Sequence, residues 1–182
     1  MLHRWVSVRV PAHSSVLVLT TIQAGDYTIR GLSVGGIYTS LFIPQLQMAL
    51  DAGAPARSFA ACRYLLLSHG HVDHSGALPS LLGIRALVGK TTPVKVLMPA
   101  DIVDPMTRML EAAAEMQRYD LSIDAVGLQP GEEHALSGDL RVRAIKTYHP
   151  VPSLGYVVFR RIPKLRKEFH GLPGSEIGRR RK

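Results

Sequence analysis

The sequence is poor in cysteine and lacks long apolar runs. Cys62 is the only cysteine among 182 residues, which excludes an intramolecular disulfide and favours a reducing compartment such as the cytoplasm. In such a chain Cys62 is expected to be a small buried residue entering a strand. No stretch approaches the roughly eighteen consecutive apolar residues that a transmembrane helix needs, so no membrane partner is expected.

Acidic residues are also scarce relative to basic ones. There are 14 Asp and Glu against 22 Lys and Arg, for a net charge of +8. Most of the excess lies at the end of the chain, because residues 159–182 contain nine Lys and Arg and two Glu. Such a segment predicts contact with a polyanion. A solvated, charged terminus is an equally simple interpretation, and the sequence leaves both open.

One short stretch carries most of the recognisable chemistry. Three apolar residues, Leu65–Leu67, are followed by Ser68 and then by His69, His71, Asp73 and His74. Residues i and i+2 of an extended segment lie on one side, so His69 and His71 can face the same ion. Asp73 and His74, at the beginning of a turn, can face a second position nearby. Isolated histidines are usually surface or core residues, but this density of imidazole and carboxylate groups predicts a site for Zn²⁺ or a similar divalent ion.

Alternating and helical patterns predict an α/β chain around this stretch. Strands are expected at 27–34, 36–43, 46–53, 63–67, 94–99, 123–126, 140–147 and 155–160, and helices at 76–88 and 105–119. The strand after residue 140 is expected to end at His149. Met106, Met109 and Met116 are expected to pack in the core, whereas the remaining histidines, His3, His13, His134 and His170, are expected at the surface.

The motif H-x-H-x-D-H at residues 69–74 resembles the signature of the metallo-β-lactamase superfamily. Other segments narrow the resemblance to the short form of ribonuclease Z, the endonuclease that removes the 3′ trailer from precursor tRNA. They are GDYTIRGLSVGGIYTSLFIP, LDAGAP, VGLQPGEEHAL, IKTYHPVPSLGYVVFRR and KLRKEFHGLPGSEI, and together they span roughly residues 25–178. The resemblance implies the αββα sandwich of the metallo-β-lactamase fold, with the C-terminal half missing or truncated.

The resemblance also implies roles for individual residues. His69, His71 and His149 would hold a first zinc, and Asp73 and His74 a second, with Mn²⁺ or Mg²⁺ as possible substitutes. Asp73 would in addition orient or deprotonate the nucleophile, and Asp51 would orient the site through hydrogen bonds; alternatively, Asp51 is only a turn residue before Gly53. Such ions lower the pKa of a bound water to about 7 and so allow phosphodiester hydrolysis at neutral pH. A homodimer is expected from the family alone.

The sequence departs from the family pattern after His149. The complete family site uses a later Asp that bridges both metals and a later His, and no Asp follows His149 in this chain. The chain is therefore expected to be the N-terminal part of a ribonuclease Z, and a poor catalyst. Residues 1–24 are expected to be an extension outside the family, 25–160 the metallo-β-lactamase-like domain, and 161–182 part of a basic arm. Within that arm, Lys164, Arg166 and Lys167 are candidates for RNA phosphate contacts, although a charged exposed helix would look the same.

Two other functions are compatible with these residues. One is another hydrolase of the superfamily, acting on a thioester, a lactone or a small phosphodiester. The other is a truncated, non-catalytic protein that binds RNA. Turnover and metal content would distinguish these functions from the nuclease.

Overall fold

The computed structural model describes residues 18–162, 170–172 and 176. The strands are β1 (Thr20–Ala24), β2 (Tyr27–Val34), β3 (Tyr38–Ile43), β4 (Met48–Leu50), β5 (Tyr64–Leu66), β6 (Val94–Pro99), β7 (Ile123–Leu128), β8 (Glu133–Ser137), β9 (Leu140–Lys146) and β10 (Leu154–Arg160). The α-helices are α1 (Val72–Ser75), α2 (Leu78–Leu87) and α3 (Val103–Gln117). Three 3-10 turns connect them: η1 (Pro44–Leu46), η2 (Arg57–Ala61) and η3 (Ala100–Ile102).

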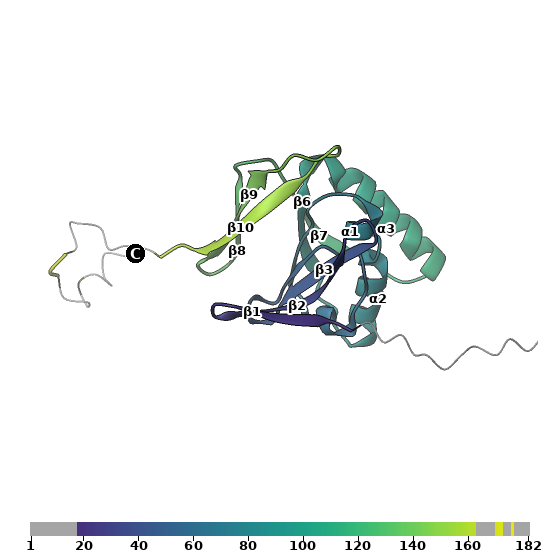
Figure 1. The fold of residues 1–182 in the computed structure, drawn as a ribbon, viewed down its shortest axis with the longest axis horizontal. Helices are drawn as coiled ribbons and strands as arrows, with labels where there is room; N and C mark the ends of the chain where they lie inside the picture. The colour runs from purple at the N-terminus through teal and green to yellow at the C-terminus, as the bar shows by residue number, and fades with distance from the viewer. Residues whose placement is uncertain (1–17, 163–169, 173–175, 177–182) are drawn as a thin grey trace, which may run out of the picture.

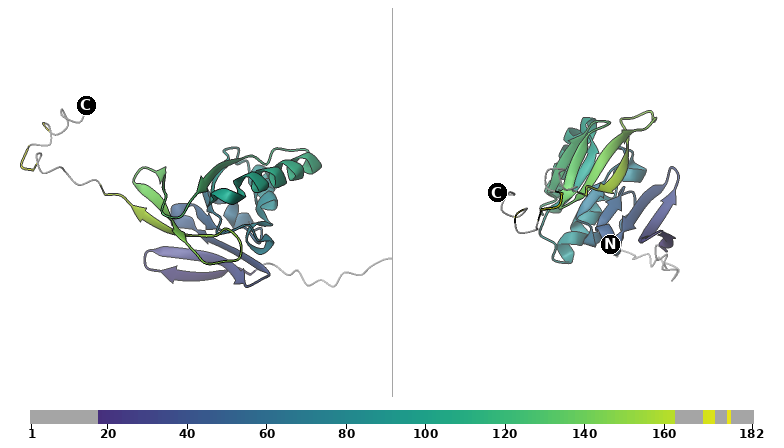
Figure 2. Two further views of the ribbon diagram at one scale, coloured as in Figure 1. Left: turned by 90° about the horizontal axis from the view of Figure 1, so that it is seen from above. Right: turned by 90° about the vertical axis from the view of Figure 1, so that its left-hand side faces the viewer.

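Ten strands form two sheets that lie face to face in the described part of the chain (Figures 1 and 2). A seven-stranded sheet has the order β1-β2-β3-β4-β5-β6-β7, and β10, β9 and β8 form a separate three-stranded sheet. The first four strands pair antiparallel, whereas β4 through β7 pair in parallel. Parallel neighbours need crossover connections, and α2 and α3 lie within two of them.

Each side of the large sheet has its own hydrophobic core. Alternation along β5 sends Leu65 toward the helices, where it packs with α2 and α3, and sends Leu66 toward the small sheet. All three residues of β5 are consequently buried. The layers therefore run helices, large sheet, small sheet, and this arrangement confirms the predicted metallo-β-lactamase sandwich up to its second sheet.

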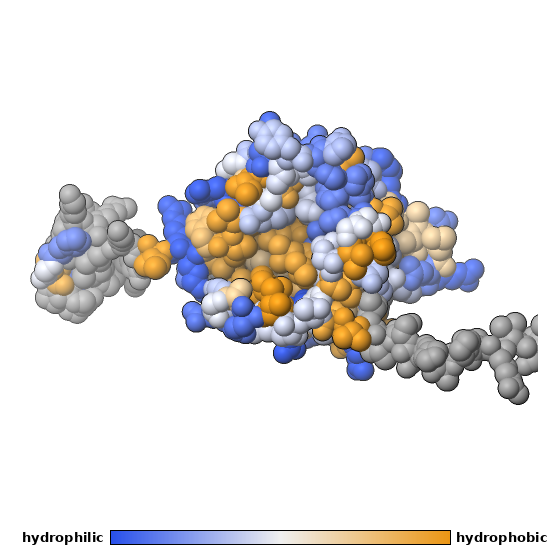
Figure 3. All heavy atoms as spheres, viewed as in Figure 1, coloured by the Kyte–Doolittle hydropathy of each residue, from blue (hydrophilic) through white to orange (hydrophobic). Residues whose placement is uncertain are grey.

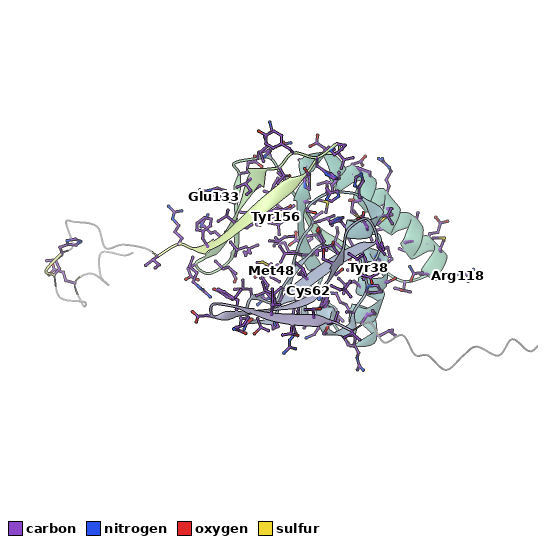
Figure 4. All side chains as sticks on the ribbon, in the orientation of Figure 1. Tyr38, Met48, Cys62, Arg118, Glu133 and Tyr156 are labelled. Carbon is purple, nitrogen blue, oxygen red and sulfur yellow. The ribbon has the colours of Figure 1, made fainter. Side chains whose placement is uncertain are left out.

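Tyr156 joins the two sheets. Its hydroxyl donates to the carbonyl of Leu67 at 2.8 Å, and the carbonyl of Leu97 lies at 3.3 Å. Burial raises the pKa of this phenol well above its ordinary value, so Tyr156 stays a proton donor. Figure 4 shows Tyr156 on β10 and Met48 on β4 in the region between the sheets. Figure 3 shows that apolar surface is concentrated in the same region.

Most predicted elements are present, but several details were wrong. The strand at Thr20–Ala24, which pairs with β2, was not predicted. The strand β8 was not predicted at all. Met106 is buried as expected, but Met116 is 80% exposed, because the core along α3 ends near Ala114. No helix in the described part of the chain is long and apolar enough to cross a membrane.

Candidate metal centre

The candidate site lies at the carboxyl ends of β4 and β5. Because these strands are parallel, Asp51 after β4 and Ser68 and His69 after β5 emerge at the same edge of the sheet. The segment between β9 and β10 is fixed to this edge at two points. Ser153 forms an isolated β-bridge with His69, and the backbone N–H of Leu154 donates to the carbonyl of Ser68 at 2.9 Å.

Three imidazoles converge at this edge. The potential ligand atoms of His69, His71 and His149 all lie within 4.8 Å of one another. Nδ1 of His71 lies 3.2 Å from Nε2 of His69 and 3.1 Å from Nε2 of His149. The structure thus brings together the three histidines that the sequence proposed, although β9 ends at Lys146 and His149 comes from the following loop rather than from the strand end.

The protonation of His69 suits a metal ligand. Burial lowers the pKa of His69 to about 4, and the neighbouring His74 and His149 act in the same direction. His69 is therefore neutral at pH 7 and has a free nitrogen lone pair. Convergent neutral imidazoles are the donor set that Zn²⁺ and similar ions prefer, so the chemistry of this triad fits a divalent cation.

A second group of side chains lies beside the triad. Nδ1 of His74 lies 2.7 Å from Oδ2 of Asp51, and Nε2 of His74 lies 3.4 Å from Oδ2 of Asp73. Because a carboxylate only accepts hydrogen bonds, Nδ1 of His74 donates to Asp51, and Nε2 is the ring nitrogen that faces Asp73. Nε2 of His74 and the Asp73 carboxylate could therefore hold a second ion together.

Asp51 makes several hydrogen bonds to Ser68 and to the histidine motif. It is buried, and its backbone adopts a positive φ of 57°, a conformation that Asp tolerates better than most residues. Oδ1 accepts the backbone N–H of Ser68 at 2.7 Å, and Oδ2 accepts the Ser68 hydroxyl at 2.9 Å. The same Oδ2 accepts the proton of His74, so one carboxylate contacts both halves of the site.

Ser68 connects this carboxylate to His69. Its hydroxyl lies 2.9 Å from Nδ1 of His69 and donates its hydrogen to Asp51, so toward His69 it can only accept a hydrogen bond. The proton of His69 is thereby held on Nδ1, which leaves Nε2 to face His71. Sequence reasoning did not identify Ser68; a hydroxyl directly before the first histidine of the motif is the signal that could have found it.

We expect Ser68→Ala to weaken zinc binding about 10- to 100-fold, because the hydrogen-bond partners of metal-binding histidines contribute on that scale. Chelator competition would measure the affinity, and ¹⁵N NMR of the His69 ring would report the loss of the Nδ1–H tautomer. Ser75→Ala is the matched control, since the Ser75 hydroxyl donates to the carbonyls of Gly70 and His71 rather than to an imidazole. Equal affinities for Ser68→Ala and Ser68→Thr would contradict the role of the hydroxyl.

The remaining predicted residues lie elsewhere. Lys164, Arg166 and Lys167 fall outside the described residues, as do His3 and His13. His170 is exposed, as expected. His134, expected at the surface, is half-buried on β8, and this burial lowers its pKa. Cys62 is buried at the entrance to β5, as predicted.

Comparisons with known proteins show the family of the chain. Residues 38–168 match the family described as a β-lactamase superfamily domain. The nuclear ribonuclease Z of Triticum aestivum is 38% identical over 158 residues, which are 87% of this chain and 89% of that protein. The chain belongs to the ribonuclease Z family within the β-lactamase superfamily.

Other relatives show how much of the family this chain covers. The tRNase Z TRZ1 of Arabidopsis thaliana is 38% identical over 156 residues, and the chain spans only 55% of its length. Among solved structures, the metallo-β-lactamase fold protein YhfI of Bacillus subtilis superimposes with a TM-score of 0.52 at 15% identity, over 70% of this chain and 53% of that one. That likeness shows the fold alone. The resemblance of the sequence to the N-terminal part of ribonuclease Z is thus confirmed.

Proposed function

We propose that the chain acts as a divalent-metal-dependent endoribonuclease that removes the 3′ trailer from precursor tRNA. The observation that carries the proposal is the convergence of His69, His71 and His149 within 4.8 Å, in a chain 38% identical to a ribonuclease Z. Zinc is the proposed metal, because imidazole nitrogen and carboxylate oxygen together suit it best. The single buried cysteine supports a cytoplasmic location.

The side chains of the candidate site would bind metal, transfer a proton or position the imidazoles. His69, His71 and His149 would hold the first ion, and Asp73 and His74 the second. A bound divalent ion supplies a more acidic water and neutralises charge on the phosphate. The Asp73 carboxylate would orient the attacking water and take its proton, while Asp51 and Ser68 hold the imidazoles in the correct tautomers.

The two positions should differ in affinity. The first has three converging imidazoles, whereas the second has one imidazole and one carboxylate among the described residues. We therefore propose that the first ion binds more tightly than the second, and that turnover by this chain alone is slow. Precursor tRNA is the proposed partner, and a homodimer, as in the family, is proposed with it.

Cleavage of a 3′-extended precursor tRNA in the presence of Zn²⁺ or Mn²⁺ tests the function. We expect a cut at the end of the acceptor stem, and we expect His71→Ala to reduce the rate at least about 100-fold because Nδ1 of His71 faces both other imidazoles. Metal analysis should show a matching loss of the tighter ion. His134→Ala, which changes a histidine on β8 outside the triad and outside the basic arm, is the control and should cut normally.

The other outcomes separate the alternatives. Binding of metal and tRNA without any cleavage would favour a non-catalytic RNA-binding protein. Hydrolysis of a thioester, a lactone or a small phosphodiester, with tRNA left intact, would favour another hydrolase of the superfamily. Either result would overturn the proposed nuclease activity of this chain.

A further inference from the structure

The loop that delivers His149 also carries an exposed aromatic side chain. Tyr148 immediately precedes His149 and is 92% exposed. The ammonium of Lys146 lies 5.4 Å from the centre of the Tyr148 ring, in a cation–π contact. Single exposed apolar residues are common on protein surfaces, so exposure alone carries no meaning. This ring, however, belongs to the residue next to His149 of the histidine triad.

The loop is held rigidly with respect to the triad. The hydroxyls of Thr147 and Ser153 lie 2.7 Å apart and close the loop, and Ser153 also forms a β-bridge with His69. Pro150 and Pro152 restrict the backbone between them. A side chain placed on such a loop loses little additional freedom when it binds a ligand, so its contacts contribute more fully to affinity.

A cavity opens next to this loop. It has a volume of about 320 Å³, and its lining includes Lys146, His149, Asp101 and Gln129. Lys146 in this lining can contact the phosphate of a nucleotide and Gln129 can hydrogen-bond its base, while Asp101 adds a carboxylate and the Tyr148 ring lies outside the lining. Because Tyr148 is the residue next to His149, its Cα lies about 3.8 Å from that of a triad residue.

We propose that Tyr148 and Lys146 form a stacking site for one unpaired RNA base next to the cleaved phosphodiester. The Tyr148 ring provides the stacking surface, and Lys146 orients the ring and attracts the neighbouring phosphate. Unpaired RNA ends are recognised by aromatic stacking in just this manner, with little dependence on base identity. The site rests on the function proposed above and specifies how the single-stranded trailer junction would be held.

Fluorescence of 2-aminopurine in the metal-free protein tests the site without requiring catalysis. The probe replaces one base at a time around the cleavage position of a 3′-extended tRNA, and stacking on Tyr148 should quench it at one position. We expect Tyr148→Ala to weaken binding about 5- to 150-fold, which corresponds to the loss of one base–aromatic stack. Tyr148→Phe should bind like the wild type. Tyr27→Ala, on the exposed hairpin of β1 and β2, is the matched control and should also bind normally.

An abasic nucleotide at the reporting position makes the test specific. It should weaken binding to the wild type by the same factor as Tyr148→Ala, and it should have no further effect on that variant. Equal abasic penalties in both proteins, equal affinities of wild type and Tyr148→Ala, or no RNA binding at all would overturn the stacking site. Unchanged zinc affinity of Tyr148→Ala would show that His149 stays in place. Failure of the metal-loaded wild type to cut tRNA would reject the proposed function, while these binding data would still decide the stacking site.

Discussion

Gly53→Ala should disrupt the second half of the metal centre and destabilise the fold. A Cβ atom at position 53 would lie 1.8 Å from the carbonyl oxygen of Asp73 and 2.7 Å from the backbone nitrogen of Thr39. Both neighbours are backbone atoms, so neither can move by a simple change of rotamer. The chain must therefore shift at Asp73, and the shift must carry Asp73 and His74 away from Asp51.

The surrounding hydrogen bonds leave little room for a smaller adjustment. Ala52 donates to the carbonyl of His74 at 2.6 Å, and Gly53 donates to that of Thr39 at 2.9 Å. Overpacking of a well-packed site typically costs about 1 to 3 kcal/mol, and we expect the upper end here because only backbone can yield. Urea unfolding would measure the loss of stability, and metal analysis should show that the second ion is no longer retained.

Gly35→Ala is the matched control for this substitution. Gly35 lies in the turn between β2 and β3, and a Cβ added there meets no atom within 4 Å. The free energy of unfolding and the metal content of Gly35→Ala should equal those of the wild type. A Gly53→Ala protein that also kept both properties would show that the contact between residues 53 and 73 does not position the motif.

The contrast between these glycines shows what the sequence could and could not predict about the site. The motif at residues 69–74 predicted that His69 and His71 would converge, because extended backbone geometry acts over a few residues, whereas His149 was expected only from the family resemblance. The close approach of Gly53 to Asp73 and the link from Ser68 to Asp51 join segments that are distant in sequence. Such contacts depend on how β4 and β5 pair, which no local pattern specifies.

The strands show the same difference between features that a local sequence pattern predicts and features that depend on pairing between distant segments. Buried central strands such as β5 and β6 were predicted well, since both of their faces need apolar residues. Strand β8 alternates only weakly and pairs with β9 through an irregular register between Ala135 and Ser137, so its sequence lacked a strong strand pattern. The strand β1 is exposed along its whole length and is defined by its pairing with β2 rather than by burial.

Arg85 was not singled out in the sequence, yet its replacement by methionine should cause a large loss of stability. Arg85 is a buried residue on α2, and its guanidinium donates to three backbone carbonyls. Nη1 contacts those of Ala60, at 2.9 Å, and Cys62, and Nη2 contacts that of Thr92 at 2.8 Å. These hydrogen bonds connect α2 to the segments that precede β5 and β6. An unsatisfied buried carbonyl costs about 1 to 3 kcal/mol, so we expect Arg85→Met to lose at least about 3 kcal/mol of the free energy of unfolding.

Urea unfolding at neutral pH measures this loss, and Arg108→Met provides the control. Arg108 pairs with Asp104 one turn away on the exposed face of α3, where such a pair contributes only about 0.3 to 0.5 kcal/mol. The zinc affinity of folded Arg85→Met should remain that of the wild type, because Arg85 donates at the amino ends of β5 and β6 and the histidines lie at the carboxyl end of β5. That separates it from Gly53→Ala, which should lose both stability and metal. A loss below about 1 kcal/mol for Arg85→Met would mean that water replaces the guanidinium at these carbonyls.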